Sequence, residues 1–169
     1  WNNATANWTG DASTFTDVFT NVTFDLSTSV TNVLVDAGGV RPNNMTVVTD
    51  TTHGYLFFGG VITSSGALSK SGVGALTFAN DVAFAGGASI FGGTLQLGNG
   101  TTLNGVISGN VADNATLAVA NPNSQTEIAG SISARAASTS VDISAILASG
   151  IGDRSKVSEA HFCTWRPGS

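Results

Sequence analysis

Residues 66–100 read GALSKSGVGALTFANDVAFAGGASIFGGTLQLGNG and consist of short apolar runs separated by glycine. One phrase, Gly-small-Leu, occurs three times within this stretch, at residues 66–68, 74–76 and 93–95. A degenerate copy, Ala-Thr-Leu, follows at 115–117. A phrase that returns along a chain at long intervals is the signature of a repeat architecture.

A second phrase recurs on either side of this stretch. Gly-Val-Ile-Thr at 60–63 returns as Gly-Val-Ile-Ser at 105–108 and as Gly-Ser-Ile-Ser at 130–133. The spacings between copies cluster near multiples of roughly 20 to 25 residues, the length of one solenoid coil. Each coil would place alternate side chains inward and could bury them only against the next coil. The repeats therefore predict an all-β solenoid of roughly six to eight coils.

The first 50 residues are also patterned as strands. Residues 22–26, VTFDL, alternate strictly between apolar and polar side chains, as in a strand with one buried face. Two further short strands are expected at 30–35 and 45–48. Residues 41–44, RPNN, predict the turn between them, because Pro42 lacks an N–H and Asn tolerates the left-handed region.

An antiparallel β-sandwich is the alternative fold. Asn-Gly pairs at 99–100 and 104–105 are strong hairpin signals, and a sandwich needs turns at short, regular intervals. These pairs could equally form the bends of a solenoid. The repeated phrases favour the solenoid, because they imply repeated coils.

The composition excludes several classes of protein. Charged residues make up 10% of the 169 residues, against roughly 25% in an average protein, and the net charge of −5 leaves no cationic surface for nucleic acid. The single Cys excludes an internal disulfide framework. We expect no transmembrane segment, because no apolar run approaches roughly 18 residues. The chain begins with Trp1 rather than Met, so we expect a piece of a longer protein.

No arrangement of residues predicts catalysis, a cofactor or a metal site. His53 and His161 are far apart and lack a metal-ligand spacing, and Cys163 has no partner base in sequence. Lys70, the one lysine before the C-terminal tail, is expected to be structural or solvated. The carboxylates that could form a glycosidase pair or a calcium site are expected to be solvated turn residues instead: Asp11, Asp17, Asp25 and Asp36.

Aromatic residues gather near the N-terminus, at Trp1, Trp8, Phe15, Phe19 and Phe24. The favoured interpretation is a cap, because the first coil of a solenoid must cover its open apolar interior. The alternative is a platform for stacking a sugar ring, with Trp1 and Trp8 as the candidate ligand-stacking residues. The Asn-x-Ser/Thr triplets, at Asn3, Asn7, Asn21, Asn44, Asn99 and Asn114, are expected by chance in a chain so rich in Asn and Thr.

Three segments resemble a known family: 70–78 (KSGVGALTF), 84–90 (FAGGASI) and 92–100 (GGTLQLGNG). Their order and spacing are similar to the autotransporter-associated β-strand repeat, in which K-x-G-x-G-x-L-T-L leads through a glycine-rich strand to G-G-T-L-x-L-G. Phe78 replaces the usual Leu, and residues 82–84 (VAF) replace Asn-Thr-Tyr. Both departures keep an inward apolar side chain.

The resemblance implies a right-handed parallel β-helix in the passenger region of an exported bacterial surface protein. It implies a structural segment at the cell surface, outside the outer membrane, that supports secretion and surface display or adhesion, without catalysis. A β-barrel or other surface anchor of the parent protein is expected outside this fragment. The alternative function is a β module that binds carbohydrate or a host surface.

Three parts of the chain are expected. Residues 1–50 would form an aromatic-rich cap or the first coils, and residues 51–150 the solenoid repeats. Residues 151–169 differ in composition, since 153–169 hold half of the six basic residues and the single Cys. We therefore expect a linker or non-native tail there.

Overall fold

The computed structural model describes residues 1–4, 14–18, 20–123, 128–134 and 140–142. Every regular element in these ranges is a β-strand, and the strands lie in three sheets, called A, B and C. Within the same ranges there is no helix with the length and apolarity to cross a membrane. The expected tail, residues 151–169, lies outside the described residues.

The sheets contain six, six and four strands. Sheet A contains β1 (Val22–Phe24), β3 (Met45–Val48), β6 (Leu68–Ser71), β9 (Ala88–Ile90), β12 (Val111–Asp113) and β15 (Ile132–Ala134). Sheet B contains β2 (Asn32–Val35), β4 (Tyr55–Gly59), β7 (Ala75–Ala79), β10 (Thr94–Leu97), β13 (Thr116–Val119) and β16 (Ser140–Asp142). Sheet C contains β5 (Ile62–Ser64), β8 (Asp81–Phe84), β11 (Val106–Ser108) and β14 (Ile128–Ala129).

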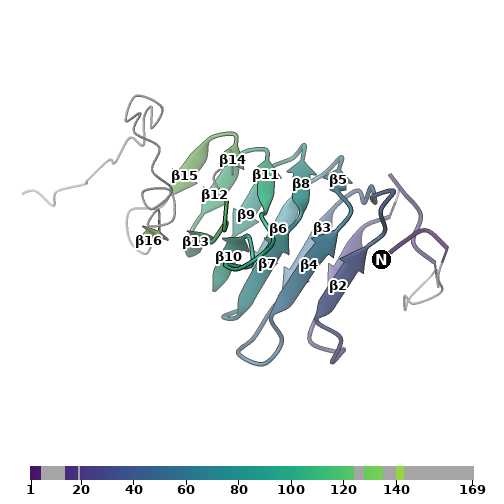
Figure 1. Cartoon of the computed structure of the whole chain (residues 1–169), viewed down its shortest axis with the longest axis horizontal. Coiled ribbons are helices and arrows are strands. Elements are labelled where there is room, and N and C mark those ends of the chain that lie inside the picture. The colour runs from purple at the N-terminus through teal and green to yellow at the C-terminus, as the bar shows by residue number, and fades with distance from the viewer. Residues whose placement is uncertain (5–13, 19, 124–127, 135–139, 143–169) are drawn as a thin grey trace, which may run out of the picture.

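The chain winds through sheets A, B and C in turn, and each strand pairs with the strand one turn earlier (Figure 1). All strand pairs among the described residues are parallel. The fold is therefore a β-solenoid of about five turns, which confirms the predicted class with fewer coils than expected. The sandwich alternative is wrong, because residues 98–105 form a loop between β10 and β11 and not a hairpin.

The core is a set of apolar columns that run along the stack. In sheet B, Leu76, Leu95 and Leu117 occupy consecutive rungs, and all three are fully buried. Ile62 lies in the corresponding column of sheet C, and Leu68 lies in sheet A. Burial of one such side chain contributes about 1.5–3 kcal/mol. Since a coil has no apolar partner except its neighbours, this stabilisation depends on stacking.

The two repeated phrases do not mark one position in the coil. Leu76 and Leu95 lie in sheet B, but Leu68, in the same phrase, lies in sheet A. Likewise, Ile62 and Ile107 share sheet C, whereas Ile132 of the 130–133 copy belongs to β15 in sheet A. The copy at 130–133 therefore occupies a different position in the coil from the other two, because the same local pattern suits any corner that leads into a strand.

Gly60 shows why glycine begins the second phrase. A Cβ at this position would lie 1.8 Å from the carbonyl oxygen of Asp36 in the preceding coil. No side chain fits at that distance, so the corner requires glycine for close approach of the two backbones.

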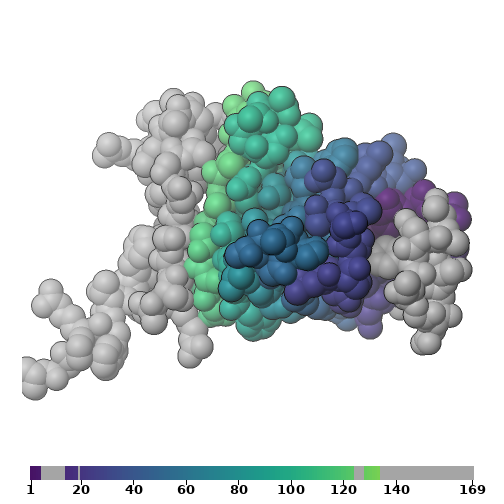
Figure 2. All heavy atoms as spheres, turned by 90° about the horizontal axis from the view of Figure 1, so that it is seen from below, coloured from purple at the N-terminus to yellow at the C-terminus, as the bar shows by residue number. Residues whose placement is uncertain are grey.

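The first coils continue directly into the repeat region. β1, β2 and β3 belong to the same sheets as the strands that follow, and the colours in Figure 2 progress continuously along the stack. Strand β3 matches its expected range of 45–48. The strands expected at 22–26 and 30–35 are present as β1 and β2, which are shorter than expected. The expected turn at 41–44 follows Val40, which forms a β-bridge with Ile62 of sheet C, and leads into β3.

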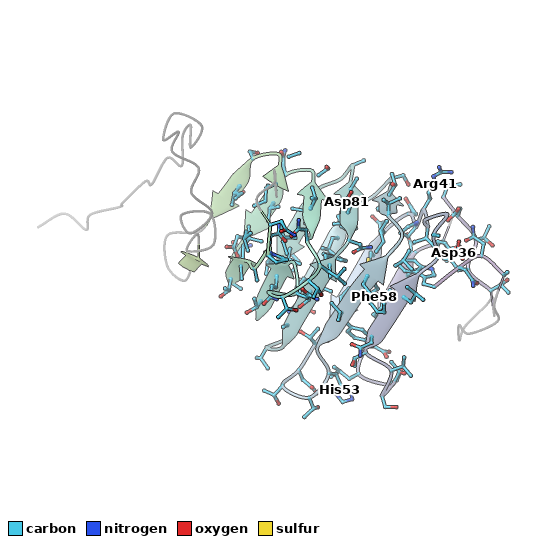
Figure 3. All side chains as sticks on the ribbon, in the orientation of Figure 1. Asp36, Arg41, His53, Phe58 and Asp81 are labelled. Atoms are coloured by element: carbon cyan, nitrogen blue, oxygen red, sulfur yellow. The ribbon has the colours of Figure 1, made fainter. Side chains whose placement is uncertain are left out.

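The outer faces are covered mainly by small or neutral side chains (Figure 3). The outward column of sheet A shows this most clearly and contains Thr23, Thr46, Ser69, Ser89, Ala112 and Ser133. Two of the Asn-x-Thr triplets, 21–23 and 44–46, occupy the same position in successive coils. Asn21 Oδ1 accepts a hydrogen bond from the Asn44 N–H at 3.1 Å, so these triplets follow from the coil geometry.

Candidate functional site

The N-terminal end of the solenoid is closed by aromatic rings. The Trp1 indole makes edge-on contacts with Phe15, Phe24 and Phe57, with centroid separations of 5.1, 5.4 and 6.3 Å. Phe15 is buried and Trp1 is half-buried. Edge-to-face packing is a favourable geometry for aromatic pairs. These rings cover the end of the core, which supports the cap interpretation.

The backbone of Trp1 adds to this closure. The Trp1 amino group donates a hydrogen bond to Leu34 O, and Trp1 O accepts one from the Asp36 N–H at 2.9 Å. Residue 1 thereby satisfies backbone groups at the edge of β2. The indole is engaged with the core and exposes only part of its surface, and Trp8 lies outside the described residues. A sugar-stacking role for these two residues stays a prediction.

A shallow polar hollow lies beside the cap. Its volume is about 380 Å³, and it is lined by Asn2, Asn3, Ala4, Asp17, Asp36, Gly38 and Gly39. Asp17 Oδ1 accepts a hydrogen bond from the Arg41 N–H at 2.6 Å, and Asp17 Oδ2 accepts one from Asn3 Nδ2 at 3.0 Å. Asp36 Oδ1 accepts one from the Gly38 N–H. The fold therefore brings two of the four considered carboxylates to one hollow and uses both to hold the chain.

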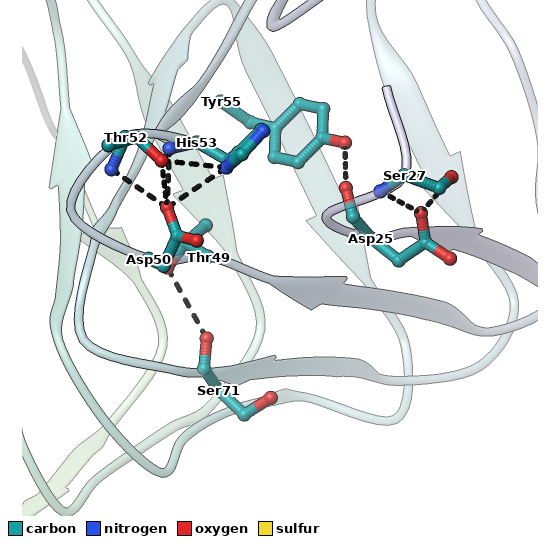
Figure 4. A network of polar contacts seen from close by, with 8 residues as sticks. All are labelled: Asp25, Ser27, Thr49, Asp50, Thr52, His53, Tyr55 and Ser71. Atoms are coloured by element: carbon teal, nitrogen blue, oxygen red, sulfur yellow. Dashed lines mark hydrogen bonds and ion pairs between the residues drawn. The ribbon is translucent and has the colours of Figure 1, made fainter. Parts of the chain in front are cut away.

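The other considered carboxylates lie elsewhere. Asp25 is exposed and accepts hydrogen bonds from the backbone and side chain of Ser27, which lower its pKa. Its carbonyl oxygen accepts a hydrogen bond from the Tyr55 hydroxyl (Figure 4). Asp11 lies outside the described residues. In the described ranges, no three His, Cys, Asp or Glu side chains converge to hold a metal ion.

His53 lies in a turn at the corner between β3 and β4 (Figure 4). Asp50 Oδ1 accepts hydrogen bonds from the backbone N–H groups of Thr52 and His53, both at 2.7 Å, and lies 3.0 Å from His53 Nδ1. These hydrogen bonds, led by those from Thr52, hold the pKa of Asp50 well below its usual range. A single carboxylate–imidazole contact in a four-residue turn provides neither an activated nucleophile nor an oxyanion site. The turn is explained as structure.

Lys70 lies in an environment that differs from the expected one. The solvated alternative is wrong, because its side chain is fully buried and points into the core from β6. Nζ donates hydrogen bonds to three backbone carbonyl oxygens, those of Ser71, Gly72 and Gly92. The signal that could have located it is alternation, since Leu68 and Lys70 share the inward face of one strand.

Comparisons with protein-family models, curated proteins and solved structures found no match. The resemblance to the autotransporter-associated repeat therefore remains a prediction, and only the fold it implies is established. His161 and Cys163 lie outside the described residues. What the described residues display is a continuous apolar core, a cap and one buried cation.

Proposed function

We propose that this chain is a structural solenoid segment of an exported bacterial surface protein, serving secretion and surface display or adhesion. The observation that carries the proposal is a core shared between coils, in which Leu76, Leu95 and Leu117 form a buried column through three successive coils. Such a stack is an extended spacer whose length grows with the number of coils.

The surface composition supports the same proposal. Outward positions are dominated by Thr, Ser, Ala and Asn, and charged residues make up 10% of the whole chain. Such a surface has little long-range electrostatic attraction for nucleic acid or for anionic lipid. The segments resembling the autotransporter-associated repeat fall on β6 to β10, and their leucines, Leu76, Leu95 and Leu97, are buried, as expected for a passenger solenoid.

The proposal is tested by locating the chain on cells of the organism that makes it. Antibodies against the folded chain should label intact cells, and brief external protease treatment should remove the label. A periplasmic or cytoplasmic protein serves as the matched control and should be labelled only after permeabilisation. Labelling of the chain only in permeabilised cells would overturn the surface assignment.

A second candidate function, carbohydrate binding, is favoured by the polar hollow beside Trp1. Amide and carboxylate groups that line a hollow can pair with sugar hydroxyls. A glycan array with the folded chain tests this function separately. Binding that is lost in an Asn3→Ala variant but kept in a Ser89→Ala variant on the distant face would make the chain a binding module.

A further inference from the structure

The buried Lys70 ammonium occupies a closed site made of backbone carbonyls. Its Nζ lies 3.1 Å from Ser71 O, 3.1 Å from Gly72 O and 2.7 Å from Gly92 O. A lysine ammonium has three donors, so three carbonyl oxygens match them in number. Hydrogen bonds to a charged donor are roughly twice as strong as neutral ones. The cation is thus compensated by aligned carbonyl groups.

The three carbonyls belong to corners of two successive coils, and a third corner joins them. Ser71 is the last residue of β6 and Gly72 follows it, whereas Gly92 lies between β9 and β10. Ser71 O also accepts hydrogen bonds from Thr49, from the N–H at 3.1 Å and from Oγ1 at 3.3 Å. One ammonium therefore connects two consecutive corners on the same edge of the stack, and Ser71 O is shared with the third.

The charges around Lys70 do not explain its burial. Strands β3 and β9, which flank β6, carry no charged side chain. In the ladder, Lys70 is followed by Ile90 and then by Asp113, two rungs away. In the described part of the chain, the ammonium donates its hydrogen bonds to the carbonyl oxygens of Ser71, Gly72 and Gly92. An uncompensated buried charge is strongly destabilising, so the carbonyls must provide the compensation.

We propose that Lys70 is an internal cation that holds two consecutive corners in register, and that its carbonyl cradle binds primary ammonium ions when the side chain is shortened. This inference rests on the fold and is independent of the surface role. A Lys70→Ala variant lacks three carbons and the nitrogen, which n-propylammonium supplies. The aliphatic part would occupy the vacated space, and the ammonium would meet the same carbonyls.

The first test replaces Lys70 with Met, a neutral side chain of similar length. We expect the unfolding equilibrium constant to rise about tenfold to a hundredfold, because buried carbonyls lose their donor. Ile90→Met, in the same ladder, is the matched control for introducing Met, and Ser69→Ala controls for changes on β6. Stability of Lys70→Met equal to or above wild type would overturn the proposal, since apolar residues often replace buried charges without loss.

The second test is chemical rescue of Lys70→Ala. Thermal stability should increase saturably with n-propylammonium chloride and should not increase with n-propanol, which has the same heavy-atom count without the charge. Wild type and Ile90→Met should respond equally to both compounds. Equal effects of amine and alcohol on Lys70→Ala would overturn the ligand-site part of the proposal.

A measurement on the wild-type chain covers the case in which the variants do not fold. The sequence contains two lysines, Lys70 and Lys156. With ¹⁵Nζ-labelled lysine, we expect one ammonium signal with slow proton exchange, assigned to Lys70 by its resistance to acylation in the folded chain. Rapid exchange and rapid acylation of both lysines would show that the ammonium is not held in the cradle.

Discussion

Two neighbouring corners of the solenoid are stabilised by side chains of opposite charge. The 49–54 corner, between β3 and β4, is held from outside by the exposed Asp50 carboxylate, which collects backbone N–H groups within three residues. The 71–74 corner, between β6 and β7, is held from inside by Lys70, whose ammonium reaches Gly92, 22 residues away. The first corner is local structure, whereas the second couples coils. We therefore expect substitutions to be tolerated at the first corner and costly at the second.

The largest effect is expected for Gly72→Ala. Gly72 has a φ of +78°, and a Cβ there would lie 1.9 Å from Thr49 O. Backbone strain and the clash should lower the free energy of unfolding by about 3 kcal/mol. Gly54→Ala, in the 49–54 corner, is the matched control, because its Cβ would lie 3.2 Å from Ala75 O. Urea denaturation measures both variants, and equal losses would contradict the difference between the corners.

A smaller effect is expected from titration of Lys70. Burial lowers its pKa from 10.5 to about 8, so between these values the folded chain binds fewer protons than the unfolded chain. Stability should therefore rise with pH across this window and be independent of this group below it.

Other groups near the corner must be separated from Lys70 in this measurement. Asp50 and His53 lie in the preceding corner, Asp113 lies two rungs along the ladder, and Tyr55 has a pKa raised by burial. The free energy of unfolding is measured by urea denaturation for wild type and Lys70→Met from about pH 7 to the unshifted pKa of 10.5. The difference between the two pH profiles removes the contribution of these other groups. Identical pH profiles of the two proteins would contradict the assignment.

Thr49→Val tests the link between the two corners. The buried Thr49 hydroxyl donates to Ser71 O at 3.3 Å, but this oxygen also accepts from the Thr49 N–H and from Lys70. Because the acceptor keeps two donors, we expect a loss within about 1 kcal/mol. In the Lys70→Met background the same substitution should be more costly, and strict additivity in a double-mutant cycle would show that the two residues are not coupled.

The smallest effect is expected for Asp50→Asn. The Asp50 carboxylate is partly exposed and hydrogen-bonded within its own turn, so we expect Tm to change by about 1–2 °C. Its lowered pKa means that the stabilisation is present above pH 3.8 and is lost as the pH falls further. Thermal scans at pH 7 and pH 3 check this, and a larger loss than for Lys70→Met would reverse the comparison.

The alternating strands of the sheets could be predicted from the residues. Val22, Leu76 and Leu95 were each expected to face inward from a short strand, and all three are buried. The candidate site was less predictable. The hollow beside Trp1 joins Asn2 and Asn3 to Asp17 and Asp36, which converge only because the first coil brings them together.

Sequence by itself determined the class of fold, because side-chain alternation and glycine at bends act within a few residues. The repeat length also followed from it, since the copies that share a sheet, such as Leu76 and Leu95, lie one coil apart. Only the tertiary structure decided which sheet each copy occupies, as Ile132 in sheet A and Ile107 in sheet C show. The burial of Lys70 also depends on the tertiary structure. The carbonyl oxygen of Gly92, which helps to compensate its charge, becomes a neighbour only when successive coils stack.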